Sequence, residues 1–278
     1  MTPVGKALWF IESHFAHELS LEEIAAVGGV SRYHMAHVFS LATGLSVMRY
    51  VRGRRLAEAA RVLAHGAPDI LTVALDVGYG SHEAFTRAFR ESFGLTPEQL
   101  RTSGTVDNIN LMEAMRMDDT PRTTVAPPRF EPLPTLFIAG LGERCTNASS
   151  AGIPAQWQRF VPHLGHIHGQ KGHTTYGVLC NSDDEGNIEY VCGVEVTDFS
   201  DVPAHWSRLH IPAHQYAVFT HQEHVSTIRR TWFTMWNTWL PDSGYEAAEA
   251  PAFERYDDTF DPTTGNGGVE LWLPVTKK

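Results

Sequence analysis

The sequence predicts an all-helical domain with two helix-turn-helix motifs, followed by an α+β domain made of two strand-helix-strand-strand modules. Two internal repeats lead to this prediction, because self-similarity at a fixed offset indicates a repeated structural unit. One repeat has an offset of fifty residues within residues 28–97, and the other has an offset of 75 residues in the second half. Charge changes along the chain as well. Residues 1–105 hold ten basic and ten acidic residues, whereas residues 106–278 hold twelve and twenty-two.

The first repeat is visible in matched runs of residues. Val27-Gly28-Gly29-Val30-Ser31 aligns with Val77-Gly78-Tyr79-Gly80-Ser81, and Gly44-Leu45-Ser46 aligns with Gly94-Leu95-Thr96. Each copy predicts a short amphipathic helix, a break at glycine, and a serine that caps a second helix. Two short helices that meet at a tight glycine turn are typical of a helix-turn-helix motif.

The other elements of the first half follow from apolar spacing and capping residues. Ser20 and Glu23 form a capping box, in which the two side chains satisfy backbone amides at the start of a helix. Thr96, followed by Pro97, indicates a further helix start. We expect helices over residues 4–16, 21–27, 47–64, 69–77 and 81–93, and helices that begin at Ser31 and Thr96.

The second half changes to strand patterning after a Thr/Pro-rich stretch that ends at Pro127-Pro128. We expect a first domain over residues 1–105, a linker over 106–121 and a second domain over 122–278. Residues 108–117 fit either a short helix or a strand. Alternating apolar residues predict strands over 130–141, 175–180, 188–196, 209–220, 253–256 and 269–275, with helices over 154–164 and 225–240. Trp157 and Trp232 are 75 residues apart in these helices, which favours two matching modules.

Composition excludes several classes of protein. The chain has 278 residues, of which 42% are hydrophobic and 19% charged, which suffices for two domain cores. It contains no run of 18 apolar residues and no basic-then-apolar opening segment, so we expect no membrane span, no signal peptide and a cytoplasmic location. The three cysteines lack CxxC spacing, which argues against a disulfide scaffold or a zinc finger. We expect no cofactor.

Three runs in the first hundred residues carry a family resemblance. They are Tyr50-Val51-Arg52-Gly53-Arg54-Arg55-Leu56, Ala74-Leu75-Asp76-Val77-Gly78-Tyr79 and Phe93-Gly94-Leu95-Thr96-Pro97. This part of the chain resembles the DNA-binding domain of AraC/XylS-type transcription regulators. The resemblance implies that the helices beginning at Ser31 and Ser81 each enter a major groove, so that one chain reads double-stranded DNA without dimerising.

Other runs carry a second resemblance, from about Arg129 onward. They are Ile138-Ala139-Gly140-Leu141, Tyr216-Ala217-Val218-Phe219, Pro251-Ala252-Phe253-Glu254-Arg255-Tyr256 and Val269-Glu270-Leu271-Trp272-Leu273-Pro274. This part is similar to GyrI-like effector-binding domains, and the order of the two domains resembles Rob-type regulators. The resemblance implies a transcription regulator controlled by a small molecule, with RNA polymerase as a further partner.

The two reader helices supply residues that occupy base-contacting positions in relatives: Tyr33, His37, His82, Glu83, Thr86 and Arg87. Arg87 can form two hydrogen bonds with guanine and Thr86 can contact a thymine methyl group; a good bidentate pair contributes roughly 1–3 kcal/mol of discrimination. A further group is better placed for phosphates, which position the protein and make binding salt-dependent: Arg49, Arg52, Arg54 and Arg90. The alternative is that these charges form a solvated face.

The last strand predicts a ligand site in the second domain. Alternation places Glu270 and Trp272 on one face, opposite the core residues, and Glu195 occupies the equivalent position in the other module. A carboxylate in an aromatic setting favours a lipophilic, cationic or hydrogen-bond-donating ligand. Relatives use a pocket glutamate in this way, and the resemblance assigns that role first to Glu270 and then to Glu195, with Trp272, Tyr256 and Phe219 as walls. The alternative is that both glutamates are ordinary surface residues.

Two other functions stay open for the second domain. Some GyrI-like domains resemble hydrolases of reactive small molecules, in which Glu270 and Tyr256 could act as acid and base. A ligand-free protein-interaction module is the other. A histidine-rich stretch could also ligate a metal, although no carboxylate or cysteine accompanies it and a loop is the simpler interpretation: His163, His166, His168 and His173.

Overall fold

The computed structural model describes residues 2–67, 69–115, 125–146, 152–181, 183 and 187–278. Contacts between Cα atoms divide the chain into two compact units. The first consists of Met1–Met35 and Ser46–Asp118, and the second of Ala36–Leu45 and Asp119–Lys278. No helix in the described ranges combines the length and the apolar character needed to cross a membrane.

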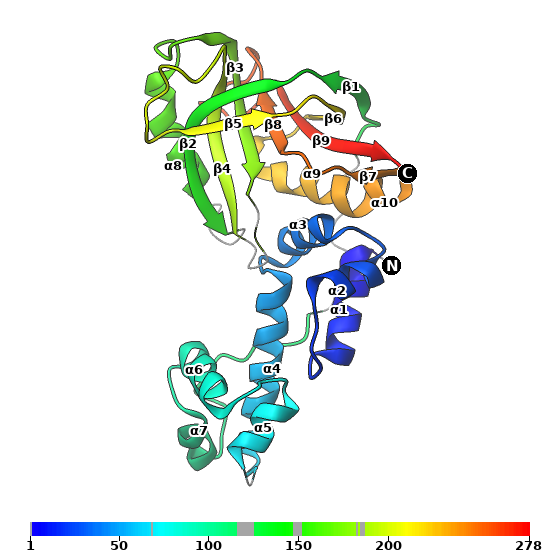
Figure 1. Cartoon of the computed structure of the whole chain (residues 1–278), viewed down its shortest axis with the longest axis vertical. Coiled ribbons are helices and arrows are strands. Elements are labelled where there is room, and N and C mark those ends of the chain that lie inside the picture. Colours follow the sequence, from blue (N-terminus) through cyan, green and yellow to red (C-terminus); the bar gives the residue numbers. More distant parts are fainter. Residues whose placement is uncertain (1, 68, 116–124, 147–151, 182, 184–186) are drawn as a thin grey trace. The chain divides into compact units, whose positions relative to one another are not determined.

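Helices build the first half of the chain (Figure 1). Their bounds are α1 (Pro3–His14), α2 (Leu21–Gly28), α3 (Arg32–Thr43), α4 (Val47–Ala64), α5 (Ile70–Asp76), α6 (His82–Phe93) and α7 (Pro97–Ser103). The predicted capping box at Ser20 with Glu23 is formed, and Thr96, where the sequence predicts a helix start, forms another with Gln99. Ser81 accepts a hydrogen bond from the amide of Ala84 and so begins α6. The predicted helical order of this region is confirmed.

The two helix-turn-helix turns are equivalent with an offset of 49 residues at the glycine, not fifty. Gly29 and Gly78 are the residues with positive φ, 73° and 80°. Each is followed by a residue whose amide bonds a carbonyl five residues back, Val30 to Ala25 and Tyr79 to Ala74. Gly80 is therefore one extra residue in the second turn, and the predicted match of Gly28 with Gly78 is wrong. A left-handed backbone conformation strongly favours glycine. Gly28 does not have this conformation and is only close to the side chain of Met35.

Strands dominate the second unit. The bounds are β1 (Arg129–Leu133), β2 (Leu136–Thr146), α8 (Ile153–Phe160), η2 (Val161–His163), β3 (Gln170–Cys180), β4 (Asn187–Val196), β5 (Ser207–Ile211), β6 (His214–His221), η3 (Val225–Thr227), α9 (Ile228–Thr234), η4 (Met235–Trp239), α10 (Leu240–Asp242), β7 (Tyr245–Ala247), β8 (Ala252–Tyr256) and β9 (Val269–Lys277). The predicted strands over 130–141 and 209–220 are each two strands. Pro134 and Pro212 stand at the two breaks, where a residue without an amide proton cannot continue the ladder.

The antiparallel sheet consists of two equivalent halves. Its order is β1-β6-β9-β8-β3-β4-β2-β5, and β7 pairs with β9. The halves β1-β6-β9-β8 and β5-β2-β4-β3 join where β3 pairs with β8. The outermost strand of each half comes from the other module. β1 precedes β2 in the chain but pairs with β6, and β5 precedes β6 in the chain but pairs with β2. The predicted pair of matching modules is confirmed.

Cross-strand pairing separates the side chains into two faces. One core cluster includes Ile138 of β2, Val218 of β6 and Trp272 of β9, and we call their side of the sheet the inner face. The cluster also contains Ile211 of the edge strand β5, so the sheet curls around it. The opposite side is the helical face, where α8 and α9 lie (Figure 1). Gln156 of α8 donates hydrogen bonds to the carbonyls of Leu141 and Tyr190 there.

Candidate functional sites

The second predicted reader helix, α6, has one buried and one exposed side. Phe85 and Phe89 are fully buried in the core of the second motif. The predicted reading residues lie on the other side and line a surface hollow of about 830 Å³, together with Glu91 and Thr96: His82, Glu83, Thr86, Arg87 and Arg90. The exposed side of this helix therefore presents the guanidinium of Arg87 and the imidazole of His82, which can read base edges in a major groove, whereas the Thr86 hydroxyl is buried.

The first predicted reader helix, α3, offers less exposed chemistry. Ser31 caps it by accepting a hydrogen bond from the amide of His34. Arg32 is exposed and pairs with Glu22 at 2.8 Å. Tyr33 is half-buried and His37 is buried, so His37 does not lie on the exposed face that the sequence predicts for it. The roles of Tyr33 and His37 in reading bases stay predictions.

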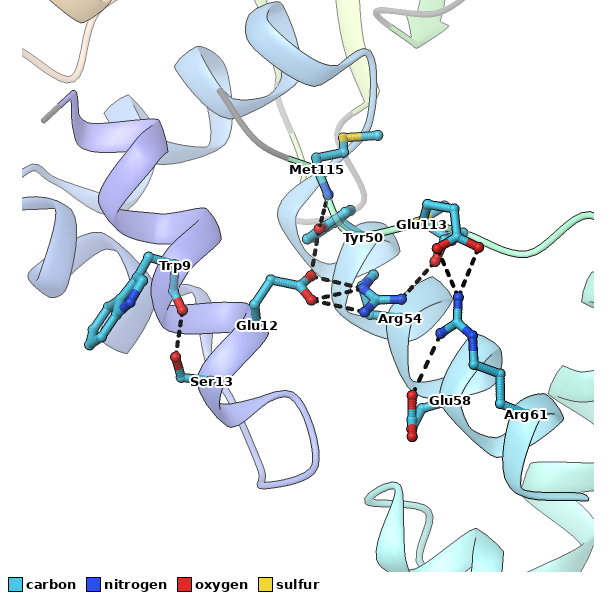
Figure 2. A network of polar contacts seen from close by, with 10 residues as sticks. Trp9, Glu12, Ser13, Tyr50, Arg54, Glu58, Arg61, Glu113 and Met115 are labelled. Carbon is cyan, nitrogen blue, oxygen red and sulfur yellow. Dashed lines mark hydrogen bonds and ion pairs between the residues drawn. The ribbon is translucent and has the colours of Figure 1, made fainter. Parts of the chain in front are cut away.

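The arginines of α4 divide into two groups. Arg49 and Arg52 are exposed, as is Arg90 of α6, and their assignment to phosphates stays a prediction. Arg54 is 6% exposed, and its guanidinium donates hydrogen bonds to both carboxylate oxygens of Glu12 (Figure 2). The prediction of a phosphate contact for Arg54 is wrong, because its charge is already paired inside the domain.

The predicted ligand residues of the second domain do not lie on one face. Register places Glu270, Trp272 and Glu195 together on the inner face, as alternation predicts. This face has a hydrophobic core of its own, which includes Trp272, so the prediction that Trp272 lies opposite the core is wrong. Tyr256 and Phe219 lie on the helical face, because their pairing partners there are Val269 and Leu271. Tyr256 and Glu270 therefore point to opposite sides of the sheet. They cannot act together on one substrate as acid and base.

The two predicted glutamates already have cationic partners. Glu270 pairs with Arg129 at 2.7 Å and with Arg255 at 3.2 Å, and it accepts a hydrogen bond from Trp272. The two guanidinium groups lie 5.9 and 6.0 Å from the Trp272 ring. Glu195 pairs with Lys171 at 2.9 Å. The chain itself supplies the cations at these positions, and the ligand roles of both glutamates stay predictions.

A different carboxylate, Glu254 of β8, occupies an aromatic site on the helical face. It is 6% exposed and accepts hydrogen bonds from the hydroxyls of Tyr190 at 2.6 Å and Tyr256 at 2.8 Å. The indole of Trp232 in α9 donates a third bond at 3.2 Å. Trp157 of α8 donates to the Tyr190 hydroxyl at 3.2 Å and packs edge-on against Tyr256. We call these five residues the Glu254 cluster.

The sheet register builds this cluster. Gly177 of β3 lies between Cys192 of β4 and Glu254 of β8 in the ladder. A Cβ atom at Gly177 would lie 2.1 Å from the Tyr190 hydroxyl and 2.7 Å from a Glu254 oxygen. The absence of a side chain at this position therefore allows Tyr190 and Glu254 to meet above β3.

The electrostatics of Glu254 follow from its neutral surroundings. Burial raises the pKa of the Glu254 carboxyl, and the hydrogen bonds from Tyr190, Tyr256 and Trp232 lower it only in part. Burial also raises the pKa of Tyr190 and Tyr256 well above the usual value for tyrosine. The hydroxyls thus stay protonated and donate. The site holds a carboxylate with three neutral donors, and a bound cation would compensate its charge.

Glu254 has no predicted role, although the strand that carries it is one of the runs that resemble GyrI-like domains. A signal was available, because Glu254 stands between Phe253 and Arg255 on the same side of the strand as Ala252 and Tyr256. A single carboxylate on the apolar side of a strand is unusual unless it is paired or functional. The partners Tyr190 and Trp232 come from other elements and could not be identified from spacing.

The histidine-rich stretch shows ordinary contacts. His163 packs edge-on against Trp206, with ring centroids 5.2 Å apart, and His168 lies 3.3 Å from Asp201. Within the part of the chain that the structure describes, no group of three or more His, Cys, Asp or Glu side chains could hold a metal ion.

Comparison with known protein families matches both halves of the chain. Residues 126–276 match the GyrI-like small molecule binding domain, and residues 24–103 match a helix-turn-helix domain. The chain is 26% identical to the transcriptional regulator Rob of Salmonella typhimurium, over 95% of this chain and 93% of that protein. It is 23% identical to the right origin-binding protein of Escherichia coli K12, over 97% and 96% of the two chains. A solved structure described as SAV2435 bound to tetraphenylphosphonium is 20% identical, with a TM-score of 0.43 over 54% of this chain and 94% of that one.

Proposed function

This chain belongs to the GyrI-like family of small-molecule-binding domains, joined to an AraC-type helix-turn-helix region, and we propose that its effector is a lipophilic cation bound at Glu254. The protein is a DNA-binding transcription regulator controlled by a small molecule. The observation that carries it is the buried Glu254 carboxylate, whose three hydrogen-bond donors are all neutral.

A cation would complete this site in two ways. It would neutralise the Glu254 carboxylate, whose burial without a counter-charge is costly. It would also lie against the rings of Trp157, Trp232, Tyr190 and Tyr256, whose negative faces attract cations. Trp157 is the half-buried member of the cluster, so its side of the site is nearest to solvent. A ligand with apolar groups around its charge suits aromatic walls better than a hydrated ion does.

Direct binding tests this proposal. Tetraphenylphosphonium, a lipophilic monocation, is titrated into the full-length protein and followed by calorimetry. We expect binding to the parent chain, a large loss in Glu254→Gln, and little change in Glu270→Gln, which alters a glutamate on the inner face. Equal binding by the parent and Glu254→Gln would refute the assignment to Glu254. Loss in Glu270→Gln alone would support the inner-face prediction instead.

For the DNA-binding half, we propose that the exposed surface of α6 reads bases and that Arg49, Arg52 and Arg90 contact phosphates. The support is the exposure of Arg87, Arg49 and Arg52, and the hollow that the reading residues of α6 and Arg90 line. Tyr33 of α3, which is half-buried, would make a further base contact; His37 is buried and would have to become exposed to add one. Footprinting of the full-length protein on a selected operator tests whether one chain protects two successive major grooves.

Two further parts of the function are proposals of the same kind. RNA polymerase is the partner expected of a transcription regulator, and recruitment is measured by polymerase binding to promoter DNA with and without this protein. The hydrolase alternative is disfavoured, because Tyr256 and Glu270, the predicted acid and base, lie on opposite faces of the sheet. Hydrolysis of a reactive ester by the full-length protein, abolished in Glu254→Gln, would support it.

A further inference from the structure

The ten residues that follow the second motif are built into the DNA-binding unit. We call residues 106–115 the strap; the sequence predicts them to be part of a linker. Val106, Ile109 and Leu111 pack against the core of the second motif, which includes Leu63, Phe85 and Phe89. None of residues 108–115 is helix or strand. The strap is nevertheless an ordered part of the packing around α4.

The end of the strap bonds a polar network on α4 (Figure 2). Arg54 donates a hydrogen bond of 2.8 Å to the carbonyl of Met112, and the Tyr50 hydroxyl accepts one of 2.9 Å from the amide of Met115. The same two side chains meet Glu12 of α1: Tyr50 donates at 2.6 Å, and Arg54 donates from Nε at 2.8 Å and from Nη2 at 2.9 Å. Two backbone groups of the strap thus complete the bonding of Tyr50 and Arg54.

Two more contacts fix the strap against α4. Met112 lies directly over Gly53, where a Cβ atom would be 2.5 Å from the Met112 sulfur and 3.3 Å from its Cβ. Glu113 pairs with Arg61 at 2.8 Å. The contacts at Gly53 and Arg61 stand eight residues apart on α4, so the strap follows more than two turns of this helix.

The network joins the two helix-turn-helix motifs. Glu12 belongs to α1, which packs on α2 of the first motif, whereas the strap begins on the core of the second motif. α4 runs between the motifs and carries Tyr50, Gly53, Arg54 and Arg61. A rotation of the first motif relative to α4 would break the Glu12 bonds, and a displacement of the second-motif core would pull on the strap.

We infer that the strap is a positioning element for DNA reading: by completing the Glu12–Tyr50–Arg54 network it holds α4 and fixes the two reader helices for simultaneous contact with two half-sites. This inference rests on the proposal that one chain reads two grooves. It assigns no DNA contact to the strap. The strap affects how much more tightly the protein binds a double site than a single half-site. A reader helix that binds alone does not need a fixed position relative to the other reader helix.

The test uses the full-length protein and an operator obtained by selection from random duplexes. Gly53→Ala inserts a methyl group into the space of Met112, and Tyr50→Phe removes the acceptor of the Met115 amide. The double variant Gly53→Ala with Met112→Ala restores the space and serves as the rescue. Hydrogen exchange of a peptide covering Met112–Met115 reports whether the strap is docked, and circular dichroism confirms that each variant is folded.

Affinity is then measured for the intact operator and for duplexes in which one half-site is scrambled. We expect faster hydrogen exchange in Gly53→Ala and Tyr50→Phe. The affinity advantage of the double site should fall roughly tenfold, corresponding to about 1.4 kcal/mol. The affinity for single half-sites should change less than about twofold. The double variant should restore both exchange and advantage. Faster exchange with an unchanged advantage, or unchanged exchange in both single variants, would overturn the inference. A parent chain without any double-site advantage would instead overturn two-groove reading itself.

Discussion

Replacing Glu254 with glutamine changes one atom and removes one buried negative charge, which makes it the sharpest test of the proposed ligand. The amide has nearly the same shape as the carboxylate and can still accept from a neighbouring hydroxyl. Glu254 is 6% exposed and its donors are neutral, so the substitution removes the carboxylate that we propose as the partner of the bound cation. Removing one partner of a buried charge pair costs about 2–5 kcal/mol in binding.

That range gives the magnitude to expect for tetraphenylphosphonium. Water is largely excluded from the site, but the ligand is a large cation whose charge is delocalised. We therefore expect a loss in the lower part of this range, about 2–4 kcal/mol, or roughly a 30- to 1000-fold increase in the dissociation constant. A neutral ligand of similar shape should lose much less. Calorimetry of the parent, Glu254→Gln and Glu270→Gln supplies the comparison. A loss of less than about threefold in Glu254→Gln, with the protein folded, would refute the reasoning.

The same variant has a pH signature without ligand. The folded protein has a raised pKa at Glu254, so it keeps this proton to higher pH than the unfolded chain does. The stability due to the protonated carboxyl is therefore fully present below the ordinary carboxyl pKa and is lost as pH rises through the raised value. Glutamine cannot titrate. The free energy of unfolding of Glu254→Gln should rise relative to the parent as pH increases in urea titrations, and a constant difference would contradict the electrostatic account.

Three other predictions concern separate parts of the chain. Gly177→Ala should destabilise the second domain by about 1–3 kcal/mol in urea unfolding, because the new methyl group meets the Tyr190 hydroxyl; wild-type stability would contradict the close approach. Arg87→Ala should flatten the preference among operator variants, whereas Arg52→Ala should weaken all duplexes alike and reduce the salt dependence; equal losses for both in filter binding would contradict the division of roles. Arg54→Met should destabilise the DNA-binding unit by about 1–3 kcal/mol at neutral pH, since it leaves Glu12 half-buried without a cation, and a neutral effect in thermal unfolding would count against the network.

The helical half was largely predictable because its signals are local. Ser20, Glu23, Ser81 and Thr96 cap helices through bonds to residues three positions away, so each capping pattern can be read locally in the sequence. The turn alignment failed by one residue, since glycine occurs at both Gly28 and Gly29 and only the backbone angle distinguishes them. The strap was also missed, because its bonds join Met112 to Arg54, 58 positions away, and Met115 to Tyr50, 65 positions away.

The ligand site shows the other limit. Alternation correctly placed Glu270 and Trp272 together on the inner face. It could not show that Arg129 and Arg255 pair with Glu270, because β1 reaches β9 only through β6 in the sheet order. Glu254 acquires its partners from β4, β8 and α9, and the pairing of β3 with β8 brings Tyr190 and Glu254 together. Long-range register, not periodicity, selects which glutamate is enclosed by aromatic rings.

The exchange of outer strands between the two modules has a consequence for how this domain can be divided. A chain ending before β5 would leave β2 with a bare edge, and the remaining piece would leave β6 without β1. Neither fragment has a finished sheet, yet the two carry complementary edges. If the chain is cleaved after residue 203, the two fragments should reassociate as a pair. A single module made alone should form a twofold dimer in which the first strand of each copy pairs with the sheet of the other copy.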